Sequence, residues 1–301
     1  MAWRLFSLEP SRLEGVVSDQ VLTERAPAGG FHPLEEPWEA RGSSPLDWPS
    51  PLYFADGRER AEALILDGRR QALLGCVAAG VLALEGGAMR LLQVRVRRVG
   101  VGLREPLSAG ELTYEPWPLG EVEEGLNPTL LQEGLGKARA ALEEEVARDL
   151  EGGLLILDGP VRLRRQGPVM GYIKTHWARY LPEDKEALLF RLRPGERTPM
   201  FRIERQGQAL ASWYLRLPLV PEGVRPPESG LLRVETPLEG PYQDMADLSL
   251  SLFPALASHP VKDKRAPQNL LPIGGLEREL GRRMGSRDLV GRILARHLGG
   301  G

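Results

Sequence analysis

The sequence of 301 residues contains a single cysteine, Cys76, so it can form neither an internal disulfide bond nor a zinc site built from several cysteines. No segment reaches the roughly 18 apolar residues that a membrane-spanning helix needs. Near the N-terminus, charged residues interrupt the chain before any apolar stretch develops, so no secretion signal is expected. These absences predict a cytoplasmic protein in which Cys76, within an apolar run, is a small buried side chain.

Neither sign of charge is in excess. The 39 Lys and Arg residues and 41 Asp and Glu residues give a formal net charge of −2. A protein without a global positive field does not attract nucleic acid as a whole, so any nucleic-acid site has to be a local groove. The charge balance therefore leaves a nuclease possible but gives no support for one.

Glycine and proline are abundant, with 35 Gly and 26 Pro, while 42% of the residues are hydrophobic and 27% are charged. This composition is typical of a globular protein with many turns and a substantial sheet. Residues 26–51 are rich in Pro, Gly, Ser and Trp without helical or alternating periodicity, and are expected to wrap over the surface. We therefore predict an N-terminal extended segment, 1–51, followed by one domain, 52–301.

Hydrophobic periodicity predicts a mixed α/β fold with a sheet flanked by helices and several helices at the C-terminus. The chain opens with strands expected at 52–55, 63–66, 73–84 and 90–101, and then has its clearest helix at 128–150 and a buried strand at 154–157. Further strands are expected at 169–174, 187–193, 200–204, 209–217 and 231–236, and helices at 242–257, 276–284 and 287–298.

Two of the apolar strands run directly into Asp-Gly, at Asp56 and Asp158. Carboxylates that converge at strand ends can hold Mg²⁺ or Mn²⁺, and such ions stabilise the attacking and leaving oxygens in cleavage of a phosphodiester. Asp-Gly also simply begins a turn, as Asp67 followed by Gly68 illustrates. Spacing alone leaves both interpretations open.

The helix before Asp158 offers a third carboxylate. Its apolar stripe centres on Leu142 and Val146, which places Glu143 and Glu145 on the two flanks of that stripe. Glu143 also lies one turn after Arg139, so a surface ion pair explains it equally well.

Basic residues lie close to these acids in the sequence. They are Arg162, Arg164 and Arg165 after Asp158, Lys174 after the next strand, and Lys264 and Arg265 near the C-terminus. Such groups could hold the phosphates of a nucleic acid, and Lys174 could bind a scissile phosphate as a point charge. A solvated strand edge explains the arginines as well.

The order of several segments resembles the NurA nucleases of DNA end resection. These segments are Tyr53-Phe54-Ala55-Asp56-Gly57, the helix with Arg139 and Glu143, Leu154-Leu155-Ile156-Leu157-Asp158-Gly159-Pro160, Gly171-Tyr172-Ile173-Lys174, and the run from His259 through Asp263-Lys264-Arg265-Ala266-Pro267-Gln268-Asn269-Leu270. The last run is similar to the C-terminal part of bacterial members, and the resemblance extends from about Leu52 to Leu298.

The resemblance implies an RNase H-like core and cleavage of DNA that depends on Mn²⁺ or Mg²⁺, in which a metal-activated water attacks the phosphodiester. It implies a 5′–3′ exonuclease and single-strand endonuclease that acts on single-stranded DNA and duplex ends in end resection and double-strand break repair. It further implies a homodimer that docks on a hexameric translocase of the HerA type.

By the same resemblance, Asp56 and Asp158 are expected to be metal ligands, and Glu143 is the expected helix ligand with Glu145 as the alternative. The archaeal pattern ends its site with a Tyr and, eight residues later, a His. In this sequence His259 would pair with Ser251, so that Tyr is missing, and Asp263 is the alternative to His259 in the last position.

Two other functions remain compatible with the sequence. The missing Tyr is what a NurA-like adaptor without catalysis would show, binding DNA or a HerA-type translocase. A different RNase H-like enzyme, acting on RNA or on a branched DNA junction, could also use two strand-end acids and a helix acid.

Overall fold

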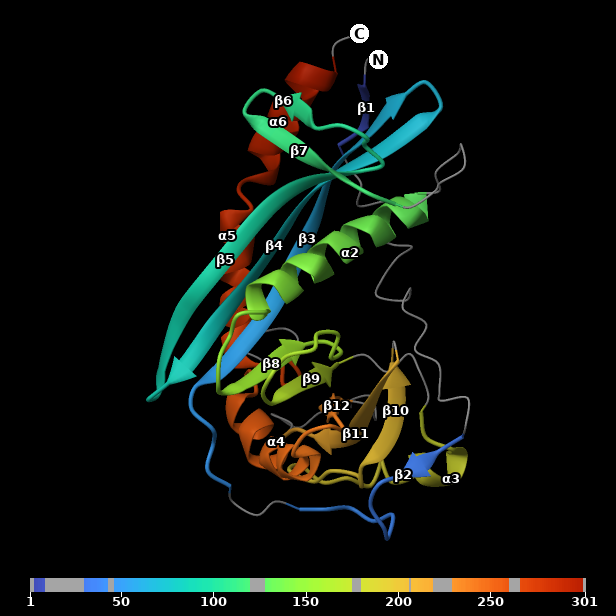
Figure 1. Ribbon diagram of the computed structural model, residues 1–301, viewed down its shortest axis with the longest axis vertical. Helices are drawn as coiled ribbons and strands as arrows, with labels where there is room; N and C mark the ends of the chain where they lie inside the picture. Colours follow the sequence, from blue (N-terminus) through green and yellow to red (C-terminus); the bar gives the residue numbers. More distant parts are fainter. Residues whose placement is uncertain are drawn as a thin grey trace.

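The computed structural model describes residues 3–8, 30–42, 46–119, 128–174, 180–205, 207–218, 229–259 and 266–299. Its centre is one mixed sheet in the order β2-β10-β11-β12-β9-β8-β3-β4-β5-β7-β6, with β1 paired to β3 beside this path. Figure 1 shows long strands crossing the upper part of the twisted sheet and shorter strands forming the lower part. The predicted mixed α/β fold, with its sheet flanked by helices, is confirmed.

The upper part is an antiparallel meander of β3 (Leu52–Asp67), β4 (Arg70–Glu85) and β5 (Ala88–Val101). Tight turns join these strands, and Gly68, Gly86 and Gly87 take positive φ angles there. The prediction of two separate strands at 52–55 and 63–66 is wrong. Asp56 and Gly57 continue the ladder, opposite Gly80 and Ala79 of β4, because the long partner strand supplies hydrogen bonds on past the Asp-Gly pair.

Several short strands were not predicted from the sequence. They are β1 (Arg4–Ser7), β2 (His32–Pro33), β6 (Leu107–Ala109) and β7 (Leu112–Trp117). Conversely, the strand expected at 187–193 is wrong. Pro182 precedes the short helix α3 (Glu183–Glu186), and the chain then continues in turns, with the Leu189 amide bonded to the Glu186 carbonyl at 2.9 Å.

The lower part of the sheet contains strands close to the predicted ones. They are β8 (Leu154–Asp158), β9 (Val169–Ile173), β10 (Phe201–Arg205), β11 (Gln208–Arg216) and β12 (Leu231–Pro237). β8 is parallel to both of its neighbours, β3 and β9, and its apolar residues are buried, as predicted for a central strand.

The remaining helices are α2 (Pro128–Ala147), α4 (Tyr242–Leu256), α5 (Leu271–Arg283) and α6 (Arg287–Leu298). Successive residues of a strand point to opposite faces, so the two faces of the meander receive different helices. Val77 of β4 packs in one core with Leu135 of α2, whereas Cys76 packs on the other side with Leu280 of α5. α2 and α5 therefore approach β3 and β4 from opposite faces.

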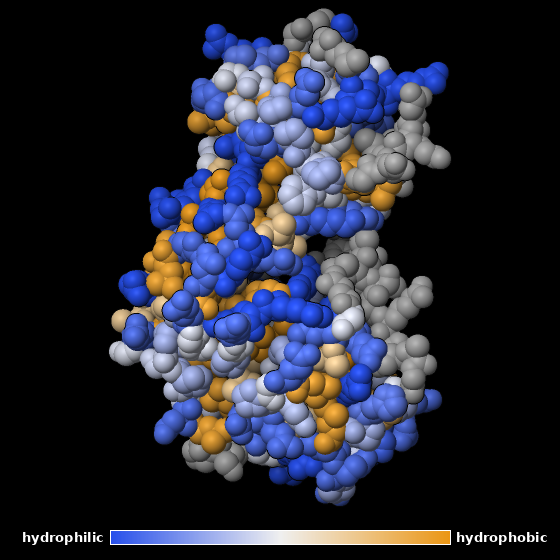
Figure 2. Space-filling view, viewed as in Figure 1, coloured by the Kyte–Doolittle hydropathy of each residue, from blue (hydrophilic) through white to orange (hydrophobic). Residues whose placement is uncertain are grey.

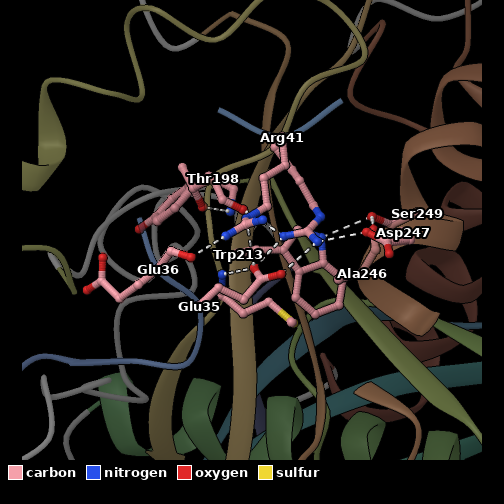
Figure 3. A network of polar contacts seen from close by, with 11 residues as sticks. Glu35, Glu36, Arg41, Thr198, Trp213, Ala246, Asp247 and Ser249 are labelled. Carbon is pink, nitrogen blue, oxygen red and sulfur yellow. Dashed lines mark hydrogen bonds and ion pairs between the residues drawn. The ribbon is translucent and has the colours of Figure 1, made fainter. Parts of the chain in front are cut away.

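Arg197, in the network that Figure 3 shows around Glu35 and Asp247, fixes the part of the N-terminal segment near Glu35 to the lower edge of the sheet. Its buried guanidinium donates to the carboxylate of Glu35 at 2.7 and 3.1 Å and to Asp247 of α4 at 2.7 Å. The Glu35 carboxylate also accepts the Met200 amide at 2.7 Å. The division into 1–51 and 52–301 remains a prediction, while β1 and β2 add the described parts of 1–51 to the sheet.

The surface in Figure 2 is mainly hydrophilic, and hydrophobic side chains gather toward its middle, along β5. There Met89 is 51% exposed, and Leu91, Val94 and Val96 are partly buried. Among the described helices, none combines the length and apolar character required to cross a bilayer.

Candidate metal centre

Asp56 and Asp158 lie side by side where β8 ends beside β3. The parallel register pairs Ala55 with Leu157, so the next residue of each strand carries its carboxylate at the same level. Beyond Asp158 the chain turns away at Gly159, whose φ is 121°, while β3 continues to Asp67. Because β8 stops here, helices on both faces of the sheet can bring side chains to this point.

The 159–161 turn lies directly against β9. A Cβ atom at Gly171 would be 2.5 Å from the Gly159 carbonyl oxygen and 2.9 Å from the Val161 amide nitrogen. The buried carboxylate of Glu235 in β12 accepts that amide at 2.7 Å. Glycine at position 171 and the acceptor at position 235 thus fix the turn that carries Asp158.

Glu277 of α5 completes a group of three carboxylates. Oxygen atoms of Asp56, Asp158 and Glu277 all lie within 4.8 Å of one another. Glu277 follows Leu276, which is buried with α5 against the sheet, so its own side chain is directed to the strand-end position. Glu277 was not among the site residues predicted from the sequence.

A signal for Glu277 is nevertheless present in the sequence. Asn269 and Glu277 are eight residues apart, the spacing expected for the Tyr and His that end the archaeal site. The structure brings these two side chains together, since Asn269 Nδ2 donates to Glu277 Oε2 at 3.3 Å. His259, the residue chosen from the sequence, is exposed after the end of α4 and is not in the carboxylate group.

Glu143 approaches from the opposite face, on α2. Its side chain lies over Gly57, where any Cβ atom would overlap its carboxylate. Glu143 pairs with Arg139, whose Nε also donates to Glu59 at 3.2 Å. The alternative acid, Glu145, points away to β5, where it pairs with Arg95 and Arg97.

The electrostatics of the site are dominated by negative charge. Burial together with the nearby carboxylates of Asp158, Glu143 and Glu277 raises the pKa of Asp56 well above its ordinary value, and Lys174 opposes this only in part. Burial also raises the pKa of Glu143, although Arg139 and Arg162 act in the other direction. A divalent cation would relieve the repulsion, and all-oxygen ligands suit hard ions such as Mg²⁺ and Mn²⁺.

Lys174 connects two of the carboxylates. Its Nζ donates to Asp158 Oδ2 at 2.5 Å and to Asn269 Oδ1 at 2.9 Å, and Asn269, fully buried, then bonds to Glu277. The neighbouring Gln268 donates to the Leu231 carbonyl at 3.1 Å and so attaches this segment to the sheet. Lys174 and Asn269 thus form one polar chain between β8 and α5.

The predicted basic residues have different environments. Arg162 is half-buried and acts electrostatically on Glu143, and Arg164 is exposed. Arg165 donates to the carbonyls of Leu150 and Gly152, at 3.1 and 2.7 Å, so its guanidinium holds the chain before β8. Asp263, Lys264 and Arg265 lie outside the described residues.

The fold and the site define a class of protein: a mixed α/β protein with carboxylates gathered where one parallel strand ends beside another, suited to a hard divalent cation. The model of the NurA domain matches residues 77–273, and the chain belongs to the NurA family. That range includes Glu143 and Asp158, whereas Asp56 and Glu277 lie outside it.

A solved structure shares this fold. The NurA nuclease from Sulfolobus solfataricus has a TM-score of 0.51 and 10% identity, over 95% of this chain and 92% of that chain. An endonuclease V from Bacillus subtilis (TM-score 0.32, 12% identity, 77% and 81% of the two chains) and one from Ciona intestinalis bound to DNA (TM-score 0.35, 11% identity, 78% and 86%) are also similar in part. No curated protein sequence matches the chain. The NurA domain, together with the Sulfolobus structure, supports a nuclease.

Proposed function

We propose that this protein is a DNA nuclease that depends on a divalent cation and has its centre at Asp56, Asp158 and Glu277. The observation that carries the proposal is the convergence of these three carboxylates within 4.8 Å. They come from two strands and a helix distant in sequence, and burial together with their mutual repulsion raises the pKa of Asp56. An arrangement that costs stability in the protein alone is typical of a functional site.

Asp56, Asp158 and Glu277 would hold the cation, with Glu143 beside them on the α2 side. When bound, Mn²⁺ or Mg²⁺ supplies Lewis-acid stabilisation of the phosphate and a lowered pKa for the attacking water. Arg139 keeps the Glu143 side chain over Gly57. Lys174, once it leaves Asp158, is positioned to bind the scissile phosphate as a point charge.

DNA is the proposed substrate, cleaved by 5′–3′ exonuclease and single-strand endonuclease activity in end resection and break repair. The resemblance of the sequence to NurA nucleases supports this, and the similar structure from Sulfolobus solfataricus is that of a NurA nuclease. The half-buried Arg162 and exposed Arg164 follow Asp158 and would contact backbone phosphates, with Lys264 and Arg265 as further candidates from the sequence.

A homodimer and a HerA-type hexameric translocase are the proposed partners, and both rest on the family resemblance. We also propose that residues 52–301 form the catalytic domain, since β3, α2, β8 and α5 carry the proposed site. Residues 1–51 would then serve as the extended segment attached to it.

The proposal is tested by degradation of end-labelled single-stranded DNA with Mn²⁺, with an EDTA control. We expect cleavage by the unchanged protein and none by Asp56→Ala. Asp67→Ala is the matched control, because Asp67 is also followed by glycine but lies in the β3–β4 turn, where it pairs with Arg70 at 3.8 Å. Full activity of Asp56→Ala would contradict the assignment.

The adaptor without catalysis is the second candidate, favoured by the absence of the C-terminal Tyr. Against it, Asn269 and Glu277 are polar residues with the eight-residue spacing of the archaeal Tyr and His, and the Glu277 carboxylate lies with those of Asp56 and Asp158. Calorimetry with Mn²⁺ separates the candidates: an adaptor that has lost its ligands would bind no Mn²⁺, whereas the nuclease would bind it through Asp56 and Asp158. A third function, that of an enzyme acting on RNA, is tested by comparing RNA and DNA substrates in the same cleavage assay.

A further inference from the structure

Tyr172 of β9 carries a buried hydroxyl group whose proton has no acceptor. The side chain is 0% exposed, and its hydroxyl group has no hydrogen-bond acceptor among the described residues. The backbone amide of Leu270 donates a hydrogen bond to the hydroxyl oxygen, but an amide N–H cannot accept a hydrogen bond from the hydroxyl group. Buried polar groups are almost always hydrogen-bonded, so an unpaired one calls for an explanation.

The position of Tyr172 relates it to the carboxylates. In the parallel pair of β8 and β9, Tyr172 is directly opposite Asp158, so the two side chains lie on the same face of the sheet. Lys174 Nζ lies 5.3 Å from the centre of the Tyr172 ring and 2.5 Å from Asp158 Oδ2. The ring, the ammonium group and the carboxylate are therefore neighbours.

The Tyr172 ring is also part of the hydrophobic core. It packs on Phe253 of α4 with ring centres 5.6 Å apart. Burial and the charges of Asp158, Asp56 and Glu277 raise the pKa of Tyr172 well above its ordinary value, so the hydroxyl keeps its proton. A neutral tyrosine hydroxyl is a hydrogen-bond donor, and Tyr172 lies on the same face of the sheet as Asp158.

We propose that Tyr172 is a positioning residue for the cation site. Its hydroxyl group would donate a hydrogen bond to the carboxylate of Asp158 when a divalent cation is bound. This inference rests on the proposed function. In the structure Lys174 occupies Asp158 Oδ2, and a cation competes with the ammonium group for the same carboxylate because both are positive. A ligand carboxylate generally keeps a hydrogen bond that fixes its orientation, and Tyr172 supplies a donor once Lys174 has left.

The test is Tyr172→Phe in the full chain, which removes the hydroxyl and keeps the ring. Tyr53→Phe is the matched control, since the Tyr53 hydroxyl donates to the Glu151 carbonyl at 3.1 Å and the side chain lies outside the carboxylate group. Mn²⁺ binding is measured by calorimetry without DNA, and thermal unfolding is measured without cation.

We expect Tyr172→Phe to unfold at the same temperature as the unchanged protein or higher, because the hydroxyl group that is removed has no hydrogen-bond acceptor in the cation-free protein. Its Kd for Mn²⁺ should rise about tenfold, the scale on which partners of metal ligands act. Tyr53→Phe should leave the Kd unchanged.

Unchanged Mn²⁺ affinity in Tyr172→Phe, with affinity lost in Asp56→Ala, would overturn this inference alone. A lower unfolding temperature of cation-free Tyr172→Phe, or failure to fold, would also overturn it, since the hydroxyl would then have a structural partner. Absence of Mn²⁺ binding by the unchanged protein would overturn the proposed function and this inference together.

Discussion

Glu143 of α2 lies directly over Gly57 of β3, so closely that a methyl group at position 57 would overlap its carboxylate. The neighbouring residue, Asp56, points to the other face and joins Asp158 and Glu277. The Asp-Gly pair therefore supplies a carboxylate on one side of β3 and room for a second carboxylate on the other.

Gly57→Ala is expected to displace Glu143 and to lower DNA cleavage at least about tenfold, because misplacement of a site residue by about 1 Å can be very costly. The strand itself should tolerate alanine, since Gly57 does not take a positive φ angle. Cleavage rate and thermal unfolding of the variant are the measurements.

Gly275→Ala is the control for this substitution. Gly275 lies in α5, two positions before Glu277, and a Cβ atom there would meet nothing within 4 Å. The variant should keep full activity and gain up to about 1 kcal/mol in free energy of unfolding from its better helix propensity. Equal activity of both glycine variants would show that the position of Glu143 does not matter.

Asp56→Asn is expected to abolish cleavage and to raise the free energy of unfolding by about 1 kcal/mol at neutral pH without cation. The pKa of Asp56 is raised in the folded state, so its ionisation destabilises the fold at pH values above the unfolded pKa. The gain should therefore shrink as pH falls toward the unfolded pKa of 3.8, below which Asp56 is protonated in both states. Urea unfolding at several pH values measures it, and a less stable Asp56→Asn protein would contradict the prediction.

Lys174→Met is expected to raise the affinity for Mn²⁺ and to lower cleavage, each about tenfold. The ammonium group neutralises Asp158 in the structure, so its loss leaves a more negative site for the cation but removes a charge for the phosphate. Calorimetry and the cleavage assay give the two values.

The control for Lys174→Met is Lys185→Met. Lys185 lies over the Trp38 ring and near the exposed Asp184, on a short helix at the sheet's lower edge. That substitution should change neither value. Weaker Mn²⁺ binding in Lys174→Met would show that the lysine supports the cation site instead of competing for it.

Glu35→Gln is expected to lower the free energy of unfolding by about 1–2 kcal/mol at pH 7, because Glu35 is one of the two carboxylate partners of the buried Arg197. Burial tends to raise the pKa of Glu35, but the Arg197 and Met200 hydrogen bonds outweigh it and lower that pKa. The stabilisation is thus present above the unfolded pKa of Glu35 and is lost as pH falls through the folded pKa.

Denaturant unfolding from pH 7 to pH 4 checks this prediction. The difference between Glu35→Gln and the unchanged protein should shrink at the acid end of this range. Glu36→Gln is the control, because Glu36 uses its backbone carbonyl, which accepts from Arg41 at 3.2 Å. A difference that is constant with pH would mean that the charge of Glu35 is not what stabilises the segment.

The local sequence pattern was sufficient to predict most of the helices and strands. The meander, α2 and β8 follow from apolar periodicity and from glycine-rich turns, both of which act over a few residues. The predicted break at Asp56 was wrong because ladder pairing with β4 overrode the turn preference of Asp-Gly. The strand expected at 187–193 was wrong because helical and turn hydrogen bonds follow Pro182.

For the site, the sequence by itself determined that Asp56 and Asp158 lie in or at the end of apolar strands and that an acidic helix precedes Asp158. Only the tertiary structure decided that Glu143 and not Glu145 faces Gly57, and that Glu277 joins the two aspartates. The rotation of a helix about its axis and the approach of α5 are set by packing against β3 and β4, between residues far apart in the chain. Periodicity describes neighbours along the chain, so it could not show which carboxylates meet in space.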